Sequence, residues 1–366
     1  MASKYQFSVL RTVEELDGLA QEWAELQWIW MMPLLDFVWV RANAKHFYAP
    51  GELHVVVARR QGTLAAVAPL ARVREGGRSS LEFIGASFTR GPCGLPYREA
   101  ADHHAMIRYL GQLHEPLTLR RWVVESSLAP SSRIRAGRGG VQVVGRPIYM
   151  PLLSISSTWG QYLKGLSSQR RYDINRAHKR MSELGTVEAT FTKPGPGELD
   201  SALEQAFELE AAGWKGRNGT SIRDNPRLSA FYRDVAHTYV AEGTLVVAFL
   251  RCGDALVATQ IALDCQGRYW VLKVGFDEAF SRGSPGFLLM SEAVKFAHER
   301  KHASVEFLGT DEPWLRAWTT ETRECVSAHF LPYSIEGARS ATRLAVRFGR
   351  AQGQEKVIDG EQRKGA

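Results

Sequence analysis

Two stretches of this chain of 366 residues carry the same pattern of hydrophobic and polar positions. In residues 51–70 and 243–262, a run of aliphatic and β-branched residues is followed by a polar turn with glycine and then by a second such run. This pattern is typical of a β-hairpin. When the stretches are aligned without gaps, Gly51 coincides with Gly243 and Arg59 with Arg251. We interpret the match as an internal duplication, and a chance likeness of two ordinary hairpins is the alternative.

Helices are also predicted before each hairpin, after the first hairpin and in a basic segment between the two. The expected helices span residues 13–26, 101–113, 199–212 and 228–241. Residues 166–184 form a further predicted helix, whose apolar face carries Ile174, Ala177, Met181 and Leu184. Short strands are expected at 80–85 and 120–125, and a Gly- and Arg-rich turn region at 133–145 leads into a strand at 141–144.

A βαβ unit is predicted between residues 267 and 311. Residues 268–276 and 304–308 are strand-like, and the segment between them has apolar residues at helical spacing. A crossover helix makes two such strands parallel, with a right-handed connection. Together with the hairpins, this unit indicates an α/β (α+β) fold of tandem domains, each with a mixed, mostly antiparallel sheet flanked by helices.

The composition is that of an ordinary folded protein, and the excess of positive charge is confined to two segments. Hydrophobic residues make up 45% and charged residues 23%, which is near the average for globular proteins. The formal net charge of +7 comes from two segments, 160–184 and 334–366, so the rest of the chain is formally neutral. This distribution argues against a uniformly basic nucleic-acid coat, and we expect no DNA partner.

The cysteines and the apolar windows argue against further classes of protein. The four cysteines form no C-x-x-C pair and no zinc-like spacing with histidine, so we expect free thiols in a reducing compartment and no metal. The most apolar window, 28–40, is interrupted by Pro33 and Asp36 and is shorter than the roughly 20 residues of a membrane span. The first residues lack the apolar core of a signal peptide. We therefore expect a cytoplasmic protein with no transmembrane segment.

The loop that enters the predicted βαβ helix has the features of an anion site. Ser284 is a favourable N-cap residue, Pro285 suits the first helical position, and Gly286 lets a ligand approach the backbone. The N–H groups and the positive dipole end of a helix start attract anions, and Arg282 adds a cation. A pyrophosphate suits this arrangement. The alternative is that Ser-Pro-Gly only begins a helix.

Six segments in the second half of the chain carry a resemblance to a known family. They are 166–177, 207–220, 226–232, 269–277, 284–286 and 307–314. In order and spacing, the region from Leu166 to about Tyr333 resembles the acetyltransferase-like proteins of the GNAT superfamily, in the CelD/BcsL branch of cellulose biosynthesis. That branch is related to the FemA/FemX aminoacyltransferases. The resemblance and the repeated hairpin together imply that the N-terminal half is a degenerate copy of the same fold.

The resemblance implies transfer of an acetyl or longer acyl group from acyl-CoA to an amine or hydroxyl of a small-molecule acceptor, such as a sugar or exopolysaccharide precursor. The residues that match the family's pyrophosphate loop are Arg282, Gly283, Ser284, Pro285, Gly286 and Phe287. The strand with Leu272, Val274 and Gly275 would diverge from its neighbour and hold the pantetheine arm. A backbone N–H there would stabilise the oxyanion.

Direct attack on a thioester needs a free nucleophile, and an amine is mostly protonated at neutral pH, so a general base is expected. The candidates for catalysis are Glu210, Lys273 and Asp311, with Glu312 as a further acid. Lys273 lies in an otherwise apolar strand, where it needs water, an acid or a ligand as its partner. Each candidate also has a structural explanation, as a cap, a surface acid or half of an ion pair.

Aromatic and amide residues complete the expected site. Trp214, Gln260 and Trp314 are candidates for contact with the substrate. Where relatives read Tyr-Lys after Asp-Glu-Pro, this chain has Trp314-Leu315, which removes a tyrosine acid from that position. Tyr172 is a weaker alternative acid.

Three functions remain open from the sequence. We expect a degenerate GNAT-like domain at 1–150, an acyltransferase domain at 151–335 with the basic linking helix 166–184, and a partly disordered basic tail at 336–366. The first hypothesis is an acyl-CoA-dependent N- or O-acyltransferase. The second is a Fem-like enzyme that uses aminoacyl-tRNA, with RNA on the basic helix. The third is a catalytically silent binding protein with the same fold.

Overall fold

A computed structural model describes residues 4–27, 32–75, 77–89, 91–123, 134–309 and 312–344. The chain divides into two compact units, and each is discontinuous in sequence. The first unit comprises Met1–Leu35, Tyr48–Ile148 and Cys325–Ala366, and the second comprises Asp36–Phe47 and Tyr149–Glu324. These units differ from the expected domains 1–150 and 151–335, which are contiguous.

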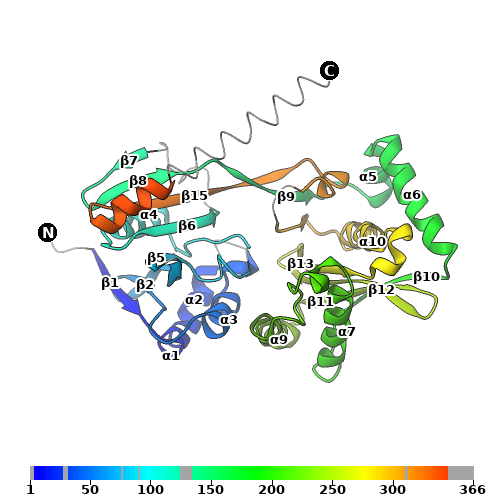
Figure 1. Ribbon diagram of the computed structural model, residues 1–366, viewed down its shortest axis with the longest axis horizontal. Helices are drawn as coiled ribbons and strands as arrows, with labels where there is room; N and C mark the ends of the chain where they lie inside the picture. The colour runs from blue at the N-terminus through cyan, green and yellow to red at the C-terminus, as the bar shows by residue number, and fades with distance from the viewer. Residues whose placement is uncertain are drawn as a thin grey trace, which may run out of the picture. The chain divides into compact units, whose positions relative to one another are not determined.

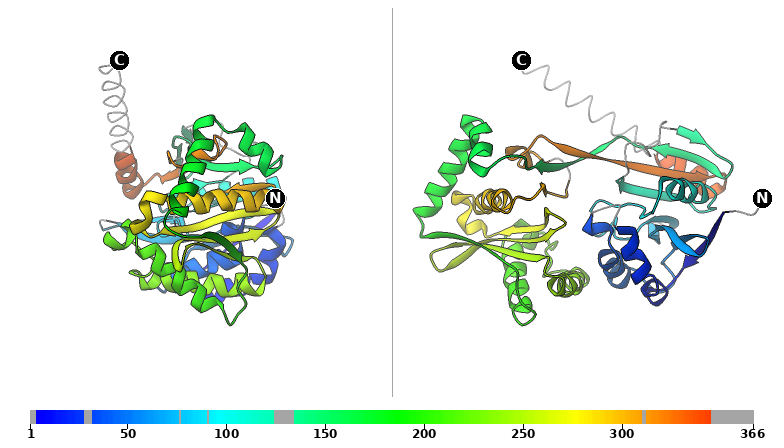
Figure 2. Two further views of the ribbon diagram at one scale, coloured as in Figure 1. Left: turned by 90° about the vertical axis from the view of Figure 1, so that its right-hand side faces the viewer. Right: turned by 180° about the vertical axis from the view of Figure 1, so that it is seen from behind.

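The second unit contains a mixed sheet with helices on both faces (Figure 1 and the right-hand panel of Figure 2). The strands lie in the order β10 (Val187–Thr192), β11 (Leu245–Cys252), β12 (Ala255–Cys265), β13 (Arg268–Phe276), β14 (Ser304–Glu306) and β9 (Ile148–Ser154). Among these neighbours, β13 and β14 are parallel and the other pairs are antiparallel.

Helices of the second unit cover the two faces of this sheet. One face packs against α10 (Pro285–Glu299), which also contacts α5 (Trp159–Gly165) and α6 (Ser168–Ser182). The other face packs against α7 (Leu199–Ala211) and α9 (Pro226–Ala241). Three short helices lie in the connections: α8 (Trp214–Arg217), η2 (Glu278–Gly283) and η3 (Leu315–Ala317).

The first unit contains two groups of strands. A three-stranded sheet has the order β1 (Tyr5–Leu10), β2 (Val55–Arg60) and β3 (Thr63–Ala68). The other group has the order β15 (Thr322–Pro332), β6 (Leu117–Trp122), β5 (Arg78–Phe83) and β4 (Leu70–Glu75), and β8 (Gly140–Val144) joins β15 to β7 (Ile134–Ala136). The helices of this unit include α1 (Val13–Asp17), α2 (Ala20–Gln27), η1 (Pro33–Leu35) and α4 (Ala100–Leu110).

The order of elements from β1 to β6 is repeated from β10 to β14. Each run passes through a strand, helices and a hairpin, then through further strand structure (β4 and β5 in the first run, β13 in the second), a helix and a strand parallel to the one before it. The hairpins also share a register irregularity, which follows Ala58 in one and Leu250 in the other. In both, the next arginine donates to a carbonyl of the turn, Arg59 to Gly62 at 3.0 Å and Arg251 to Asp254 at 2.8 Å. The predicted tandem α/β fold is confirmed.

Strands β13 and β14 pair over three residues and then separate. Arg268–Trp270 pairs with Ser304–Glu306, whereas β13 continues to Phe276. Strand β13 also has a bulge against β12, because Ile261 faces Lys273 while Ala262 faces Val271, so that Leu272 has no opposite residue. The predicted βαβ unit is therefore present, and its strands open toward their carboxyl ends, where open α/β sheets bind ligands.

Helix α3 (Phe37–Phe47) belongs to the second unit although it comes from the N-terminal part of the chain. The Trp39 ring lies edge-on against Phe231 of α9, with centroids 4.9 Å apart. Tyr239 of α9 donates a hydrogen bond of 3.0 Å to Asp36, which precedes α3. Aromatic packing and a buried polar contact thus fix α3 on α9.

Several expected boundaries shift in the structure. The helix predicted over 13–26 is interrupted at Gly18, which caps α1. The strand predicted at 120–125 begins three residues earlier, at Leu117, and ends at Trp122. The basic tail is helical from residue 335 to residue 344, and the remainder of the tail lies outside the described residues.

Candidate functional site

Helix α10 begins after a residue in the left-handed conformation. Ser284 has φ 53° and ψ 55°, and its N–H donates to the carbonyl of Ser281 at 3.0 Å. Among the described residues, its side chain makes no capping hydrogen bond. The N–H groups of Gly286 and Phe287 belong to the first turn, where a helix has no carbonyl of its own to offer them. Together with the helix dipole, they favour an anion at this position.

Close packing requires the two glycines of this loop. A Cβ atom at Gly283 would lie 2.6 Å from the Cε of Met181 in α6. One at Gly286 would lie 2.9 Å from the ring of Phe276, the last residue of β13. Both distances are well below the normal separation of carbon atoms in contact. The loop is therefore held between α6 and the end of β13.

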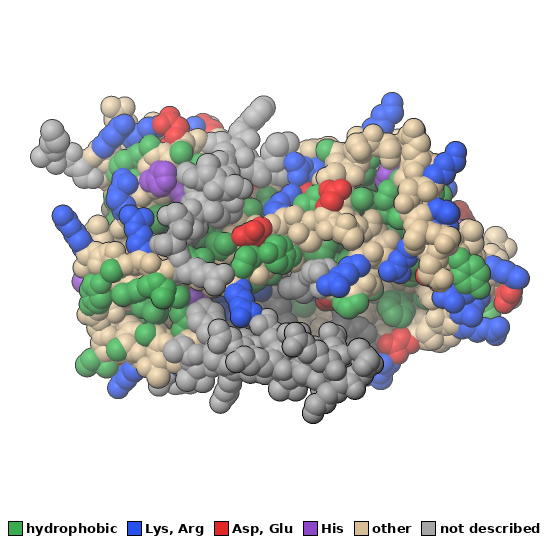
Figure 3. Space-filling view, turned by 90° about the horizontal axis from the view of Figure 1, so that it is seen from above, with side chains coloured by type: hydrophobic (Ala, Val, Ile, Leu, Met, Phe, Trp, Pro, Cys, Tyr) green, Lys and Arg blue, Asp and Glu red, His purple; other side chains and the backbone are tan. Residues whose placement is uncertain are grey.

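A pocket of about 230 Å³ lies between α6 and the start of α10. It is lined by Asp173, Arg176, Ala177 and Arg180 of α6 and by Ser284 and Phe287. The Arg176 guanidinium also contacts the carboxylate of Asp173 at 3.1 Å. On the right of Figure 3, Lys and Arg side chains gather over α6. The pocket combines two guanidinium groups with a helix N-terminus, and both features bind phosphate.

Arg282, the cation expected beside the loop, is mostly in solvent. Its side chain is 78% exposed and lies 4.0 Å from Glu183, and it does not line the pocket. The sequence indicates Arg176 and Arg180 only as part of a basic helical surface. Their spacing of four residues places them on one face of α6. Which element that face meets depends on tertiary packing, and the sequence pattern does not contain this information.

Residues Leu272, Val274 and Gly275 lie on the part of β13 that has separated from β14. Leu272 is the bulged residue, and Val274 packs against the core beneath α10. A Cβ atom at Gly275 would lie 2.6 Å from the Cα of Glu210 in α7. Only glycine allows β13 to approach the α7 backbone this closely.

Glu210 is buried where α7, β13 and the loop after α8 meet. Its side chain is 4% exposed, and its Oε2 accepts a hydrogen bond of 2.8 Å from the N–H of Ile222. The structure thus brings Glu210 next to the strand that carries Lys273 and Gly275. The hydrogen bond from Ile222 also ties the Glu210 side chain to the loop after α8, which is a structural role.

Lys273 projects from the face of the sheet that α9 covers. Its ammonium nitrogen lies 5.5 Å from the centre of the Tyr232 ring, which is a cation–π distance. Burial, and then the charge of Glu210, raise the pKa of Tyr232 above its ordinary value. Tyr232 is therefore a further candidate site residue; it lies in segment 226–232, one of those that carry the resemblance, but no pattern in the sequence singles it out.

Gln260 lies on the opposite face of the sheet, beneath α10. It faces Val274, the residue after Lys273, and neighbouring residues of a strand point to opposite faces. Its Oε1 accepts the Tyr269 hydroxyl at 2.7 Å, and its amide contacts the Met290 sulfur at 3.8 Å. The structure therefore does not bring Gln260 together with Lys273 and Glu210.

The expected aromatic residues differ in their surroundings. Trp314 is 42% exposed, and its Nε1 donates to Glu312 at 2.6 Å. Trp318 is buried and packs against Phe287 at a centroid distance of 4.8 Å, so it contacts the start of α10. Asp311 and the side chain of Trp214 lie outside the described residues.

An ion pair ties segment 207–220, one of those that carry the resemblance, to the start of η2. The guanidinium of Arg217 in α8 donates to both carboxylate oxygens of Glu278, at 2.6 and 3.1 Å. Glu278 begins η2, which leads directly into Ser284. The pair therefore links the loop near Glu210 to the loop that begins α10.

The described residues offer neither a metal site nor a membrane-spanning helix. Within these ranges, no group of three or more His, Cys, Asp or Glu side chains is arranged to hold a metal ion. Nor does this part of the chain contain a helix of the length and hydropathy that crossing a membrane requires.

Residues 168–316 match the family model of the acetyltransferase (GNAT) domain. The matched region begins with α6 and ends in η3, so it contains the pocket, β13, Glu210 and Lys273. The fold is therefore of the tandem GNAT-like type, and the segment that matches the acetyltransferase (GNAT) domain lies in the second half of the chain. No curated protein sequence matches the chain significantly.

Solved structures share the fold over most of the chain. The C-terminal domain (DUF2156) of an Agrobacterium fabrum protein has a TM-score of 0.53 and 8% identity, over 90% of this chain and 97% of that chain. L-PGS from Bacillus licheniformis has a TM-score of 0.51 and 10% identity, over 90% and 96%. FemX has a TM-score of 0.49 and 10% identity, over 89% and 97%. At such identities, the likeness concerns the fold alone.

Proposed function

We propose that this protein is a cytoplasmic, acyl-CoA-dependent N- or O-acyltransferase that acts on an amine or hydroxyl of a small-molecule acceptor. The observation that carries the proposal is the pocket between α6 and α10. There, Arg176, Arg180 and a helix N-terminus lie next to the open end of β13. The match of residues 168–316 to the acetyltransferase (GNAT) domain supports the same function.

The residues of this pocket fit the acyl-CoA substrate. Its diphosphate is an anion that two guanidinium groups and the N–H groups of Gly286 and Phe287 would hold. The extended pantetheine arm would lie along β13, where Leu272, Val274 and Gly275 lie beyond the pairing with β14. An extended ligand can bind such a backbone edge as an added strand.

In the proposed reaction, the nucleophile of the acceptor attacks the thioester carbonyl directly. The new C–N or C–O bond forms as the C–S bond breaks, and the thiolate of CoA leaves and takes up a proton. A backbone N–H of β13 would stabilise the oxyanion. We assign acceptance of the proton from the nucleophile to Glu210, and we assign Lys273 and Tyr232 to its positioning. Asp311 remains a further candidate base.

For the acceptor, we propose a sugar or exopolysaccharide precursor. The support is the resemblance of the chain to the CelD/BcsL branch. A second support is the exposed ring of Trp314, in the same short segment as Trp318, which packs on Phe287. A sugar ring can stack on such an aromatic face.

A second candidate is aminoacyl transfer from aminoacyl-tRNA. The observation that favours it is the cationic surface of α6 outside the pocket, which includes the exposed Arg171 and Lys179 and the partly exposed Arg170. Such a surface would bind the phosphates of RNA, and affinity would fall steeply with salt. Filter binding of charged tRNA at low and high salt tests this candidate, and weak binding that does not depend on salt would exclude it.

The experiment that tests the main proposal is a panel of acyl-CoA donors and amino-sugar acceptors, with release of free CoA thiol as the readout. We expect thiol release that requires both a donor and an acceptor. If acyl-CoA binds but no acceptor accelerates thiol release, the protein is a binding protein with this fold. If acyl-CoA does not bind at all, the proposal loses its donor and fails.

A further inference from the structure

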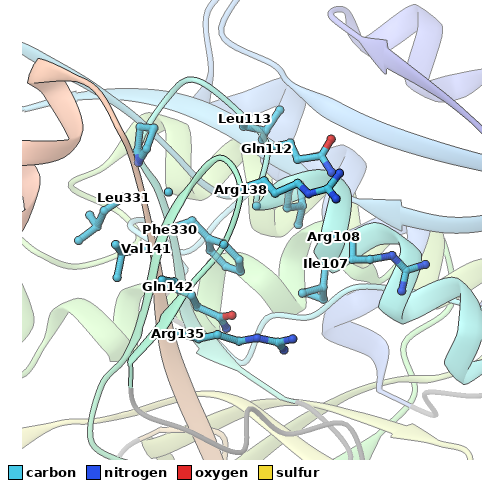
Figure 4. Close-up of a pocket in the computed structure, with 16 residues that line it drawn as sticks. Ile107, Arg108, Gln112, Leu113, Arg135, Arg138, Val141, Gln142, Phe330 and Leu331 are labelled. Atoms are coloured by element: carbon cyan, nitrogen blue, oxygen red, sulfur yellow. The ribbon is translucent and has the colours of Figure 1, made fainter.

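A second pocket is built from residues of the first unit. Its volume of about 400 Å³ falls within the range of roughly 300–1,000 Å³ typical of ligand sites. It lies at the C-terminal end of α4, against the β7–β8 hairpin and the end of β15 (Figure 4). In the duplicated fold, α4 corresponds to α10, whose other end carries the proposed acyl-CoA pocket. The second pocket therefore does not correspond to the acyl-CoA pocket in the duplicated fold.

Three neighbouring strands supply one row of its lining. Arg135 of β7 faces Gln142 of β8, and Gln142 faces Phe330 of β15. Residues directly opposite each other in a sheet project from the same face. The row thus presents a cation, an amide and an aromatic ring side by side, and Figure 4 shows the Phe330 ring among the labelled side chains.

The turn between β7 and β8 carries a second cation, Arg138. A Cβ atom at Gly139 would lie 2.5 Å from the carbonyl oxygen of Gly111, and one at Gly140 would lie 2.2 Å from that of Leu331. The N–H of Gly137 donates to the carbonyl of Gly140 at 2.8 Å and closes the turn. Only glycine allows this approach, and it holds Arg138 at the tip of the turn. This is the Gly- and Arg-rich segment of the sequence, to which the proposed acyl transfer gives no role.

The end of α4 adds a third cation, and neither the negative end of the helix nor an acidic side chain among the described lining residues offsets the positive charge of the pocket. Arg108 lines the pocket from the last turn of α4. The carbonyls of Ile107, Tyr109 and Leu110 accept hydrogen bonds from the N–H groups that follow, so the negative end of the helix is largely satisfied. Among the described residues that line the pocket, none is acidic. The rest of the lining is mainly apolar and includes Ile107, Leu113, Val141 and Leu331.

We propose that this pocket binds a small amphipathic anion, a phosphate monoester joined to an apolar group. Arg108, Arg135 and Arg138 would bind the phosphate, since guanidinium groups match its charge and geometry. The apolar group would lie against Phe330 and the aliphatic side chains around it. The site is independent of acyl transfer, because its residues belong to the first unit and the acyl-CoA pocket to the second.

Calorimetry on the full chain tests this proposal with octyl phosphate below its micelle concentration, inorganic phosphate and octanol. We expect saturable binding of octyl phosphate, and weaker binding of the other two probes. The double variant R135Q/R138Q should bind octyl phosphate at least about tenfold more weakly. The matched control R74Q/R227Q removes two exposed arginines elsewhere and should bind as the wild type does. Binding of acetyl-CoA should be the same in all three proteins.

Four results would overturn the proposal. They are an absence of saturable binding to the wild type, equal losses in the two double variants, an affinity for inorganic phosphate equal to that for octyl phosphate, and binding only to vesicles of phosphatidic acid. The last result would identify a membrane surface as the ligand. Circular dichroism would establish that R135Q/R138Q is folded, and both residues are exposed, so its stability should be unchanged.

Discussion

Asp36 illustrates how one residue can make the stability of the fold depend on pH. Its carboxylate accepts hydrogen bonds from the N–H of Trp39 at 2.7 Å and from the Tyr239 hydroxyl at 3.0 Å. Burial raises its pKa from the ordinary value to about 7, and the charge of Glu242 acts in the same direction. A raised pKa means that the folded state holds the proton more tightly than the unfolded state. The stabilisation is complete below the unfolded pKa of about 4 and is lost as the pH rises through 7.

We therefore predict that D36N has a flatter stability profile than the wild type. Between pH 5 and pH 8, the free energy of unfolding of the wild type should fall by about 2 kcal/mol more than that of D36N, because Asn carries no charge to bury. Urea unfolding at a series of pH values measures the difference. Parallel profiles for the two proteins would show that Asp36 does not titrate in this range.

Glu210 offers a test that separates a catalytic from a structural role. In E210Q, the amide oxygen can still accept the hydrogen bond of Ile222, so the free energy of unfolding should stay within about 1 kcal/mol. Loss of the proposed base should lower kcat about 100-fold or more, with acyl-CoA affinity unchanged. The control is E208Q, an exposed residue of the same helix. A normal kcat for E210Q would leave Glu210 with a structural role only.

At the scale of elements, sequence periodicity predicts the helices and strands whose pattern is contained in their own residues. The apolar and turn residues of both hairpins and of the βαβ unit follow the order typical of these motifs, and the structure contains all three motifs. The residue at which β13 leaves β14 and the bulge at Leu272 depend on neighbouring strands, so they have no local signature. The requirement for glycine at position 275 also has no local signature, because it arises from the close approach of the α7 backbone.

We predict that G275A disturbs the contact between β13 and α7. The added methyl group would lie 2.6 Å from the Glu210 Cα, so strand and helix must move apart, at a cost of about 3 kcal/mol. The control is G197A, which has no atom within 4 Å of the added group. Thermal unfolding compares the two variants. Equal stability for G275A and G197A would contradict the close approach.

At the scale of the whole molecule, the position of α3 was not predictable from the sequence. Residues 37–47 have ordinary helical apolar spacing, and nothing local indicates that they pack with α9. The duplication was predictable because the two hairpins keep aligned residues. The proposed anion pocket was predictable only in part: the loop Ser284-Pro285-Gly286 has a local helix-start signal, whereas Arg176 and Arg180 reach it only through the packing of α6 on α10.

The interleaving of segments predicts how a fragment behaves. The contiguous segment 151–335 lacks α3, whose Trp39 and Phe47 side chains are buried and pack against Phe231. We expect this fragment to be less stable than the same fragment with residues 36–47 joined to it, by about 4 kcal/mol, from the loss of two buried aromatic contacts. Urea unfolding and binding of a hydrophobic dye measure the difference. Equal stability would show that α3 contributes little to the second unit.

The central claim is that the pocket between α6 and α10 holds the phosphates of acyl-CoA. Calorimetry with acetyl-CoA on the wild type, on R176Q/R180Q and on R170Q/K179Q tests it most directly. The last variant removes two charges from the same helix at positions that do not line the pocket. We predict saturable binding to the wild type, a loss of at least about tenfold in R176Q/R180Q, and nearly normal binding in R170Q/K179Q. Equal affinities in all three proteins, or equal losses in both variants, would contradict the claim.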